Sequence, residues 1–87
     1  MKNIQIKKQH NQVYTGLAID IDVTIGSNLY IIRGIYNTLT KKAKLNIVEI
    51  DSHRYLKSHP QDLLKWCKKS GYDYTEMVEY IINNFKK

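Results

Sequence analysis

The chain has 87 residues and a formal net charge of +6, with 43% hydrophobic and 25% charged residues. This length leaves room for one small domain spanning residues 1–87 and excludes a second. Apolar runs fall far short of the roughly 20 residues that a membrane span needs, and the first residues lack a signal-peptide apolar region. We therefore expect a cytoplasmic protein without a membrane partner, and the single cysteine, Cys67, excludes an internal disulfide framework.

The N-terminal part of the chain predicts two strands. In residues 2–8, Ile4 and Ile6 alternate with polar neighbours, and lysines at both ends indicate an edge strand. A polar turn over Gln9 to Gln12 leads to a longer strand over residues 13–25. Its period of two sorts the side chains onto two faces. One face carries Leu17, Ile19, Ile21, Val23 and Ile25, and the other carries Asp20, Asp22 and Thr24.

Residues 26–44 fit two interpretations. As a helix over Asn28 to Lys42, Ser27 is the N-cap and the apolar residues Leu29, Ile32, Ile35, Tyr36 and Leu39 recur at helical spacing. As a strand, Gly26 and Ser27 form a two-residue hairpin that sets Asp20 opposite Arg33, Ile21 opposite Ile32 and Val23 opposite Tyr30. Local propensity favours the strand. The apolar run that follows, Leu45 to Asp51, favours a strand–helix–strand unit, so we predict the helix.

The segment from Ser58 to Tyr74 predicts a helix with both ends marked. Pro60 suits its first position, Asp62 its first turn, and Gly71 a left-handed stop after Lys68 and Lys69. Its apolar stripe contains Leu63, Leu64, Trp66 and Cys67. The prediction is a helix over residues 60–70, connected to the preceding strand by residues 52–58.

A second helix is predicted up to Phe85. Asp73 and Glu76 stand three apart as in a capping box, and Val78, Ile81, Ile82 and Phe85 form a stripe. Two short strands over the same residues are the alternative. The predicted fold class is therefore α+β, a two-layer sandwich with helices packed on one face of a small sheet.

The basic balance indicates attraction to phosphate backbones or to an acidic protein surface. The candidate nucleic-acid surface combines cationic side chains with one tyrosine that can stack on an unpaired base. Its members are Lys41, Lys42, Lys44, Arg54, Tyr55, Lys57, Lys65, Lys68 and Lys69. A solvated face that serves only solubility is the alternative.

Catalytic and metal sites have little support in the sequence. Asp20 and Asp22 would converge with Glu49 and Asp51 on a hard cation only if their strands were neighbours. The three histidines do not match zinc-ligand spacing, and Cys67 on an apolar helical stripe is typical of a small core residue. We expect no metal, no cofactor and no catalytic residue.

The segment Asp62-Leu-Leu-Lys-Trp-Cys-Lys-Lys-Ser-Gly-Tyr resembles the second helix and following turn of TusA-type sulfur-carrier proteins. The predicted order of strand, helix, strand and helix is also similar to that family. The Cys-Pro-x-Pro that carries sulfur there is matched here only by Gly26-Ser27-Asn28-Leu29, so the resemblance implies the fold rather than the chemistry. Gly26-Ser27 and Gly71-Tyr72 similarly resemble elements of small acyl-CoA-dependent acetyltransferases.

The function that these features favour is non-enzymatic binding. The abundance of Lys, Ile, Asn and Tyr, whose codons are AT-rich, is typical of a low-GC bacterium or its phage. We predict a small regulator or inhibitor, encoded by a phage or mobile element, that acts on nucleic acid or a nucleoprotein complex. The alternatives are a protein-only inhibitor or subunit, and a degenerate sulfur carrier or acetyltransferase. The sequence leaves the oligomeric state open.

Overall fold

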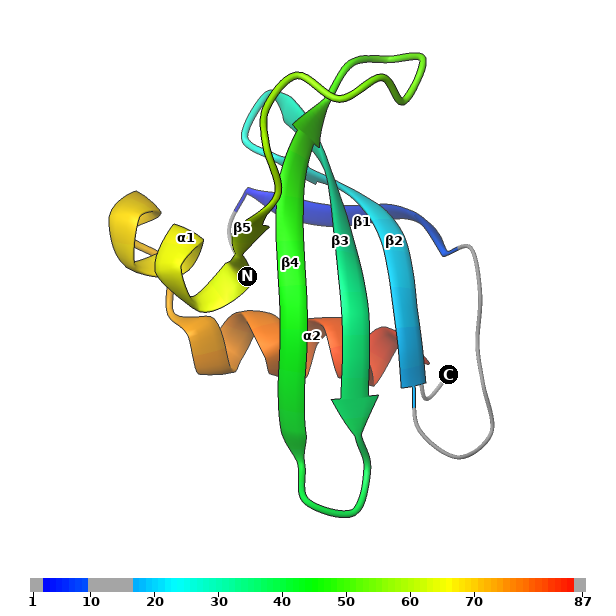
Figure 1. The fold of residues 1–87 in the computed structure, drawn as a ribbon, viewed down its shortest axis with the longest axis vertical. Coiled ribbons are helices and arrows are strands. Elements are labelled where there is room, and N and C mark those ends of the chain that lie inside the picture. Colours follow the sequence, from blue (N-terminus) through cyan, green and yellow to red (C-terminus); the bar gives the residue numbers. More distant parts are fainter. Residues whose placement is uncertain (1–2, 10–16, 86–87) are drawn as a thin grey trace.

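The computed structural model describes residues 3–9 and 17–85, which form an α+β fold of one antiparallel sheet and two helices (Figure 1). The elements are β1 (Ile4–Gln9), β2 (Leu17–Ile25), β3 (Asn28–Asn37), β4 (Lys42–Ile50), β5 (Gln61–Asp62), α1 (Leu63–Ser70) and α2 (Tyr74–Phe85). The strands lie side by side in chain order, so the sheet is a meander with β1 at one edge, as predicted. The turn predicted after Gln9 and the first residues of the strand predicted over 13–25 lie outside the described residues.

The sheet has an inner face, which packs against both helices, and an outer face, which no described helix covers (Figure 1). The alternation predicted for β2 is confirmed, because Ile19, Ile21, Val23 and Ile25 are buried in the main core with residues of α1 and α2. Asp20 and Asp22 belong to the outer face. The predicted two-layer arrangement is therefore the observed one.

The helix predicted over Asn28 to Lys42 is wrong, because this segment forms β3 and the hairpin turn after it. The alternative hairpin interpretation had the right register, since Asp20 pairs with Arg33 and Ile21 pairs with Ile32. The physical reason is that the middle of β3 is buried on both faces. Ile32 is buried in the main core and Ile31 in a smaller core on the outer face, which suits a strand of consecutive apolar residues.

The boundaries of the next elements also differ from the prediction. β4 begins at Lys42, three residues before the predicted strand, because Lys42 pairs with Asn37. Pro60 is not helical, since Gln61 and Asp62 pair with β4 as the short strand β5. Asp62 is instead the N-cap of α1, where its carboxylate accepts a hydrogen bond from the Lys65 N–H at 3.3 Å.

The remaining helix signals are confirmed. Gly71 ends α1 in the left-handed conformation, with φ of 81°, after the predicted Lys68 and Lys69. The Asp73 carboxylate accepts from the Glu76 N–H at 3.1 Å and so caps α2, which forms in place of the alternative pair of strands. Within the described residues, neither helix is long and apolar enough to span a membrane.

Candidate nucleic-acid interface

A cavity of about 400 Å³ opens on the inner side of the sheet, between the β3–β4 hairpin and α2. The hairpin contributes Tyr36, Lys41 and Ala43 to its wall. The helix contributes Tyr74, Thr75, Val78, Glu79, Ile82 and Asn83. Two aromatic rings, an ammonium group, a carboxylate and an amide therefore surround one space, which is large enough for a planar ring system.

The hairpin holds Lys41 in a defined position at the mouth of this cavity. The Asn37 side-chain oxygen accepts from the N–H groups of Leu39 at 2.9 Å and Thr40 at 3.1 Å. The Lys41 N–H donates to the Asn37 carbonyl at 2.8 Å. Lys41 closes the turn with a φ of 58°, a left-handed conformation that is uncommon for a residue other than glycine. The tight turn thus fixes the backbone from which the lysine projects.

The two tyrosines approach the cavity from different layers. Tyr36 is on the inner side of β3 and pairs with Ala43, while Tyr74 is the first residue of α2. The Tyr74 hydroxyl donates to the Ala43 carbonyl at 3.4 Å, which ties the helix start to β4. Burial raises the pKa of Tyr74, and the nearby Asp62 carboxylate adds to that effect, so its hydroxyl is a neutral donor around pH 7. Both rings are half-buried and keep part of their surface accessible.

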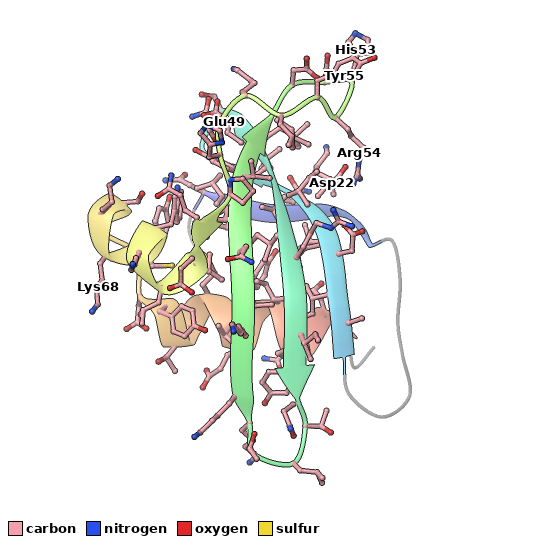
Figure 2. All side chains as sticks on the ribbon, in the orientation of Figure 1. Asp22, Glu49, His53, Arg54, Tyr55 and Lys68 are labelled. Atoms are coloured by element: carbon pink, nitrogen blue, oxygen red, sulfur yellow. The ribbon has the colours of Figure 1, made fainter. Side chains whose placement is uncertain are left out.

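The nine residues predicted for the nucleic-acid surface lie at three places in the fold. The hairpin lysines, Lys41, Lys42 and Lys44, lie at the hairpin end of β4. The helix lysines, Lys65, Lys68 and Lys69, lie on α1. Arg54, Tyr55 and Lys57 belong to the loop of residues 51–60 at the opposite end of β4, as Figure 2 shows for Arg54, Tyr55 and Lys68.

Only the cations of the loop group are paired with carboxylates in the part of the chain that the structure describes. Arg54 pairs with Asp22 and Asp20 on β2, and Lys57 pairs with Glu49 at 3.3 Å. The hairpin lysines and the helix lysines make no ion pair with any described residue. Of the nine predicted residues, these six keep ammonium groups that remain available for phosphate groups.

Tyr55, predicted to stack on an unpaired base, is 71% exposed. The length of β4 separates it from the hairpin lysines, roughly 27 Å at about 3.3 Å per residue. The tyrosines that line the cavity with Lys41 are instead Tyr36 and Tyr74, which the sequence interpretation missed. The alternative interpretation of residues 26–44 as a strand contained a usable signal. Extended to Tyr36, that strand ends beside the turn that contains Lys41.

The four carboxylates considered for a metal ion do not meet. Asp20 and Asp22 are on β2, Glu49 is on β4 and Asp51 is in the 51–60 loop, while β3 lies between β2 and β4. The Asp51 carboxylate instead accepts from the N–H groups of Tyr55 and His53, which lowers its pKa. Among the described residues, no group of His, Cys, Asp and Glu side chains is arranged to hold a metal ion.

Cys67 is a core residue, as its position on the apolar stripe predicts. It is fully buried, and its thiol donates to the Met77 sulfur at 3.7 Å. Burial raises the pKa of the Cys67 thiol from 9.0 to about 11, and the carboxylates of Asp73 and Asp62 act in the same direction. The reactive thiolate is therefore scarce at neutral pH.

Comparisons with protein-family models, with curated proteins and with solved structures each gave no match. The segment that resembles the sulfur-carrier helix, Asp62 to Tyr72, contains α1 and its C-terminal glycine. The strand, helix, strand order expected from that resemblance is not observed, because β2, β3 and β4 form a meander.

Proposed function

We propose that the protein is a non-enzymatic binder of single-stranded nucleic acid, free or within a nucleoprotein complex. The hairpin lysines contact successive phosphates, and one unpaired base enters the cavity against Tyr36 and Tyr74. The observation that carries this proposal is the position of the cavity. Two tyrosines and Lys41 line it, and Lys42 and Lys44, which have no ion pair with a described residue, follow in β4 on the outer face of the same hairpin.

The chemistry of the cavity favours an unpaired base over a duplex. A base in a duplex is stacked and paired, so it cannot reach a space between a hairpin and a helix. Tyrosine rings stack on any base, while the Glu79 carboxylate and the Asn83 amide offer an acceptor and a donor to its edge. The composition and charge further fit a small cytoplasmic regulator or inhibitor encoded by a phage or mobile element.

Fluorescence anisotropy with labelled single-stranded and duplex DNA and RNA, over a salt series, tests the proposal. Each phosphate contact contributes about 0.7 to the log–log salt slope for single strands. Replacing the three hairpin lysines by Gln should lower the slope by about 2. The matched control replaces the three helix lysines by Gln, which removes the same charge and should leave the slope nearly unchanged.

Tyr36→Leu tests the stacking contact separately from charge. It should weaken single-strand binding by about tenfold or more, because stacking of one base contributes about 1–3 kcal/mol, and it should leave the salt slope unchanged. Equal effects of the two lysine triples would show a diffuse charge attraction and contradict the proposed interface. Tighter binding of duplex than of single strands would contradict the role of the cavity.

A further inference from the structure

The outer face of the sheet carries a second, smaller core that is only partly covered. Ile31, Val48 and Ile50 are buried there, and Leu29 packs against them. The 51–60 loop folds over one end of this core, where Leu56 pairs with Ile50. The helices lie on the opposite face of the sheet (Figure 1), so the rest of the outer face has no covering layer among the described residues.

A groove of about 370 Å³ lies where the loop covering ends. Its walls include Ile31, Val48, Leu56 and Pro60, and its floor runs past Gly34. Leu56 of the loop is 62% exposed. On β3, the next apolar side chain after Ile31 on the outer face is Ile35, which is 64% exposed. Ile35 lies beyond the groove, with Arg33 and Asn46 between it and the Ile31–Val48 pair, so the outer face carries two neighbouring exposed apolar positions.

The groove is preformed, because several bonds fix the loop that bounds it. Arg54 pairs with Asp22 on β2, as Figure 2 shows, and the Lys57 N–H donates to the Glu49 carbonyl at 2.8 Å. The Ser58 hydroxyl accepts from the Glu49 N–H at 3.2 Å. A partner therefore meets a surface that needs little ordering when it binds, which lowers the entropic cost of binding.

The exposed charges around the groove and Ile35 are positive, because Asp20 and Asp22 on this face are largely buried against Arg33 and Arg54. Arg33 is the one charged residue in the groove wall, with 67% of its side chain exposed, and Asp20 is its partner at 3.5 Å. Lys44 lies beside Ile35 in the sheet, and Lys42 follows on the same face of β4. Same-face residues two apart in a strand are about 7 Å apart, close to the spacing of side chains one turn apart on a helix.

We propose that this groove docks an acidic amphipathic helix of a partner protein. Apolar residues of the helix fill the groove over Gly34, and its Glu or Asp residues face Lys44, Lys42 and Arg33. A strand cannot add between β3 and β4, because the backbone groups that these strands turn toward each other are already paired. The occupant must therefore pack through side chains, as α2 does on the inner face.

Charge distinguishes this occupant from the other candidates. A second copy of the chain would bring a net charge of +6 and the same positive rim against this one. Nucleic acid would meet an apolar groove whose lining contains no aromatic side chain on which a base could stack. The groove and the cavity share no lining residue, although Lys42 and Lys44 belong to both proposals. Leu56→Ser and Tyr36→Leu each change one of the two sites alone, so the failures of the two proposals are distinguishable.

The probe is a synthetic helical peptide of about 18 residues, long enough to form a helix when bound, with a Leu stripe flanked by Glu. Its controls are a scrambled peptide and one with Gln in place of every Glu. Isothermal titration should show saturable binding that the scrambled peptide lacks and the Gln peptide weakens by about tenfold. In methyl NMR spectra, the signals of Ile31, Val48 and Leu56 should shift while the Tyr36 and Tyr74 ring signals should not.

Leu56→Ser and Ile35→Ser should each weaken peptide binding by about tenfold, because each removes an exposed apolar contact. Leu64→Ser on α1, where Leu64 is 40% exposed, is the matched control and should bind the peptide normally. Circular dichroism verifies that each variant is folded. Oligonucleotide affinity should be the same for Leu56→Ser as for the original chain.

Three results would overturn the proposal. The first is the absence of saturable peptide binding, or binding that Leu56→Ser leaves unchanged. The second is a dimer in sedimentation experiments that Leu56→Ser abolishes, which would show that a second copy occupies the groove. The third is an oligonucleotide that shifts the groove methyl signals instead of the tyrosine signals.

Discussion

Arg54, in the loop after β4, donates to the carboxylate of Asp22 on β2, with 2.5 Å between Nη1 and Oδ1. The same guanidinium group lies 3.8 Å from Asp20, and both carboxylates are largely buried, with side-chain exposures of 12% and 14%. β3 lies between β4, which precedes the loop, and β2, which carries both carboxylates. The Arg54 side chain therefore extends across the outer face of β3. This pair holds the 51–60 loop against the sheet.

Arg54→Gln should destabilise the fold by about 2 kcal/mol, because it removes a cation that two largely buried carboxylates contact, while Asp20 keeps its ion pair with Arg33. Lys57→Gln is the matched control, since its ion pair with Glu49 is more exposed and should contribute less than about 1 kcal/mol. Urea unfolding monitored by Trp66 fluorescence measures both. Similar losses for the two variants would show that Arg54 does not fix the loop.

Gly34→Ala should destabilise the fold by about 3 kcal/mol or more. A Cβ at Gly34 would fall on the Lys44 carbonyl oxygen, and its φ of 152° is one that other residues rarely adopt. Gly26→Ala is the control, because Gly26 has a φ of 62° but nothing within 4 Å of its Cβ position. It should cost about 1 kcal/mol from backbone strain alone. A smaller loss at Gly34 than at Gly26 would contradict the close approach of β3 and β4.

Lys41→Gly should change stability and binding in opposite directions. Glycine adopts the left-handed turn conformation freely, so the variant should be more stable by about 0.5–1 kcal/mol. Loss of one phosphate contact should lower the salt slope for single-stranded nucleic acid by about 0.7. Thermal unfolding and anisotropy on the same preparation measure the two effects. An unchanged salt slope would show that Lys41 does not contact a phosphate and would contradict its place in the proposed interface.

Stability should fall as the pH rises above about 9. The pKa of Cys67 is about 11 in the folded protein and 9.0 in an exposed thiol, so the folded state favours the protonated form. The stability associated with this difference is complete below pH 9 and is lost as the pH rises toward 11. The raised pKa of Tyr74 acts in the same direction at still higher pH.

Cys67→Ala removes the thiol and should flatten this alkaline decline, apart from the part due to Tyr74. Denaturation midpoints from pH 7 to 11 provide the measurement. In the original chain, a thiol reagent at pH 8 should react no faster than the protein opens. Rapid labelling of the folded protein would show that Cys67 is accessible and would contradict its burial.

Sequence patterns predicted the elements whose signals are local. The period of two in residues 17–25, the Asp73 cap and the Gly71 stop each depend on a few neighbouring side chains, and all are observed. The fold class followed from them. The helix predicted for the β3 segment was wrong, because Leu29, Ile32 and Ile35 recur at helical spacing while the consecutive Ile31 and Ile32 suit a strand buried on two faces. Only tertiary packing decides between these, since Ile31 is buried against Val48 and Ile50 of β4.

The candidate site was only partly accessible to sequence reasoning. Lys41, Lys42 and Lys44 were identified from their charge, but their tyrosine neighbours were not. Tyr36 lies near Lys41 because both belong to the β3–β4 hairpin. Tyr74 is distant in sequence, and its hydrogen bond to the Ala43 carbonyl holds it at the same cavity. The helix start predicted at Pro60 was wrong, because Gln61 pairs with Ile47 of β4. That pairing cannot be predicted without the position of β4 in the fold.

The bond from the Tyr80 hydroxyl to the Ile4 carbonyl, at 3.5 Å, joins residues 76 positions apart. During synthesis, β2, β3 and β4 can pair as soon as they leave the ribosome, because each neighbour in the sheet is also a neighbour in the chain. Their inner face and the position of β1 nevertheless depend on α2, which follows all the strands in the chain. The nascent chain therefore exposes a paired but uncovered apolar sheet until α2 has emerged, and chaperone binding should concentrate in that interval.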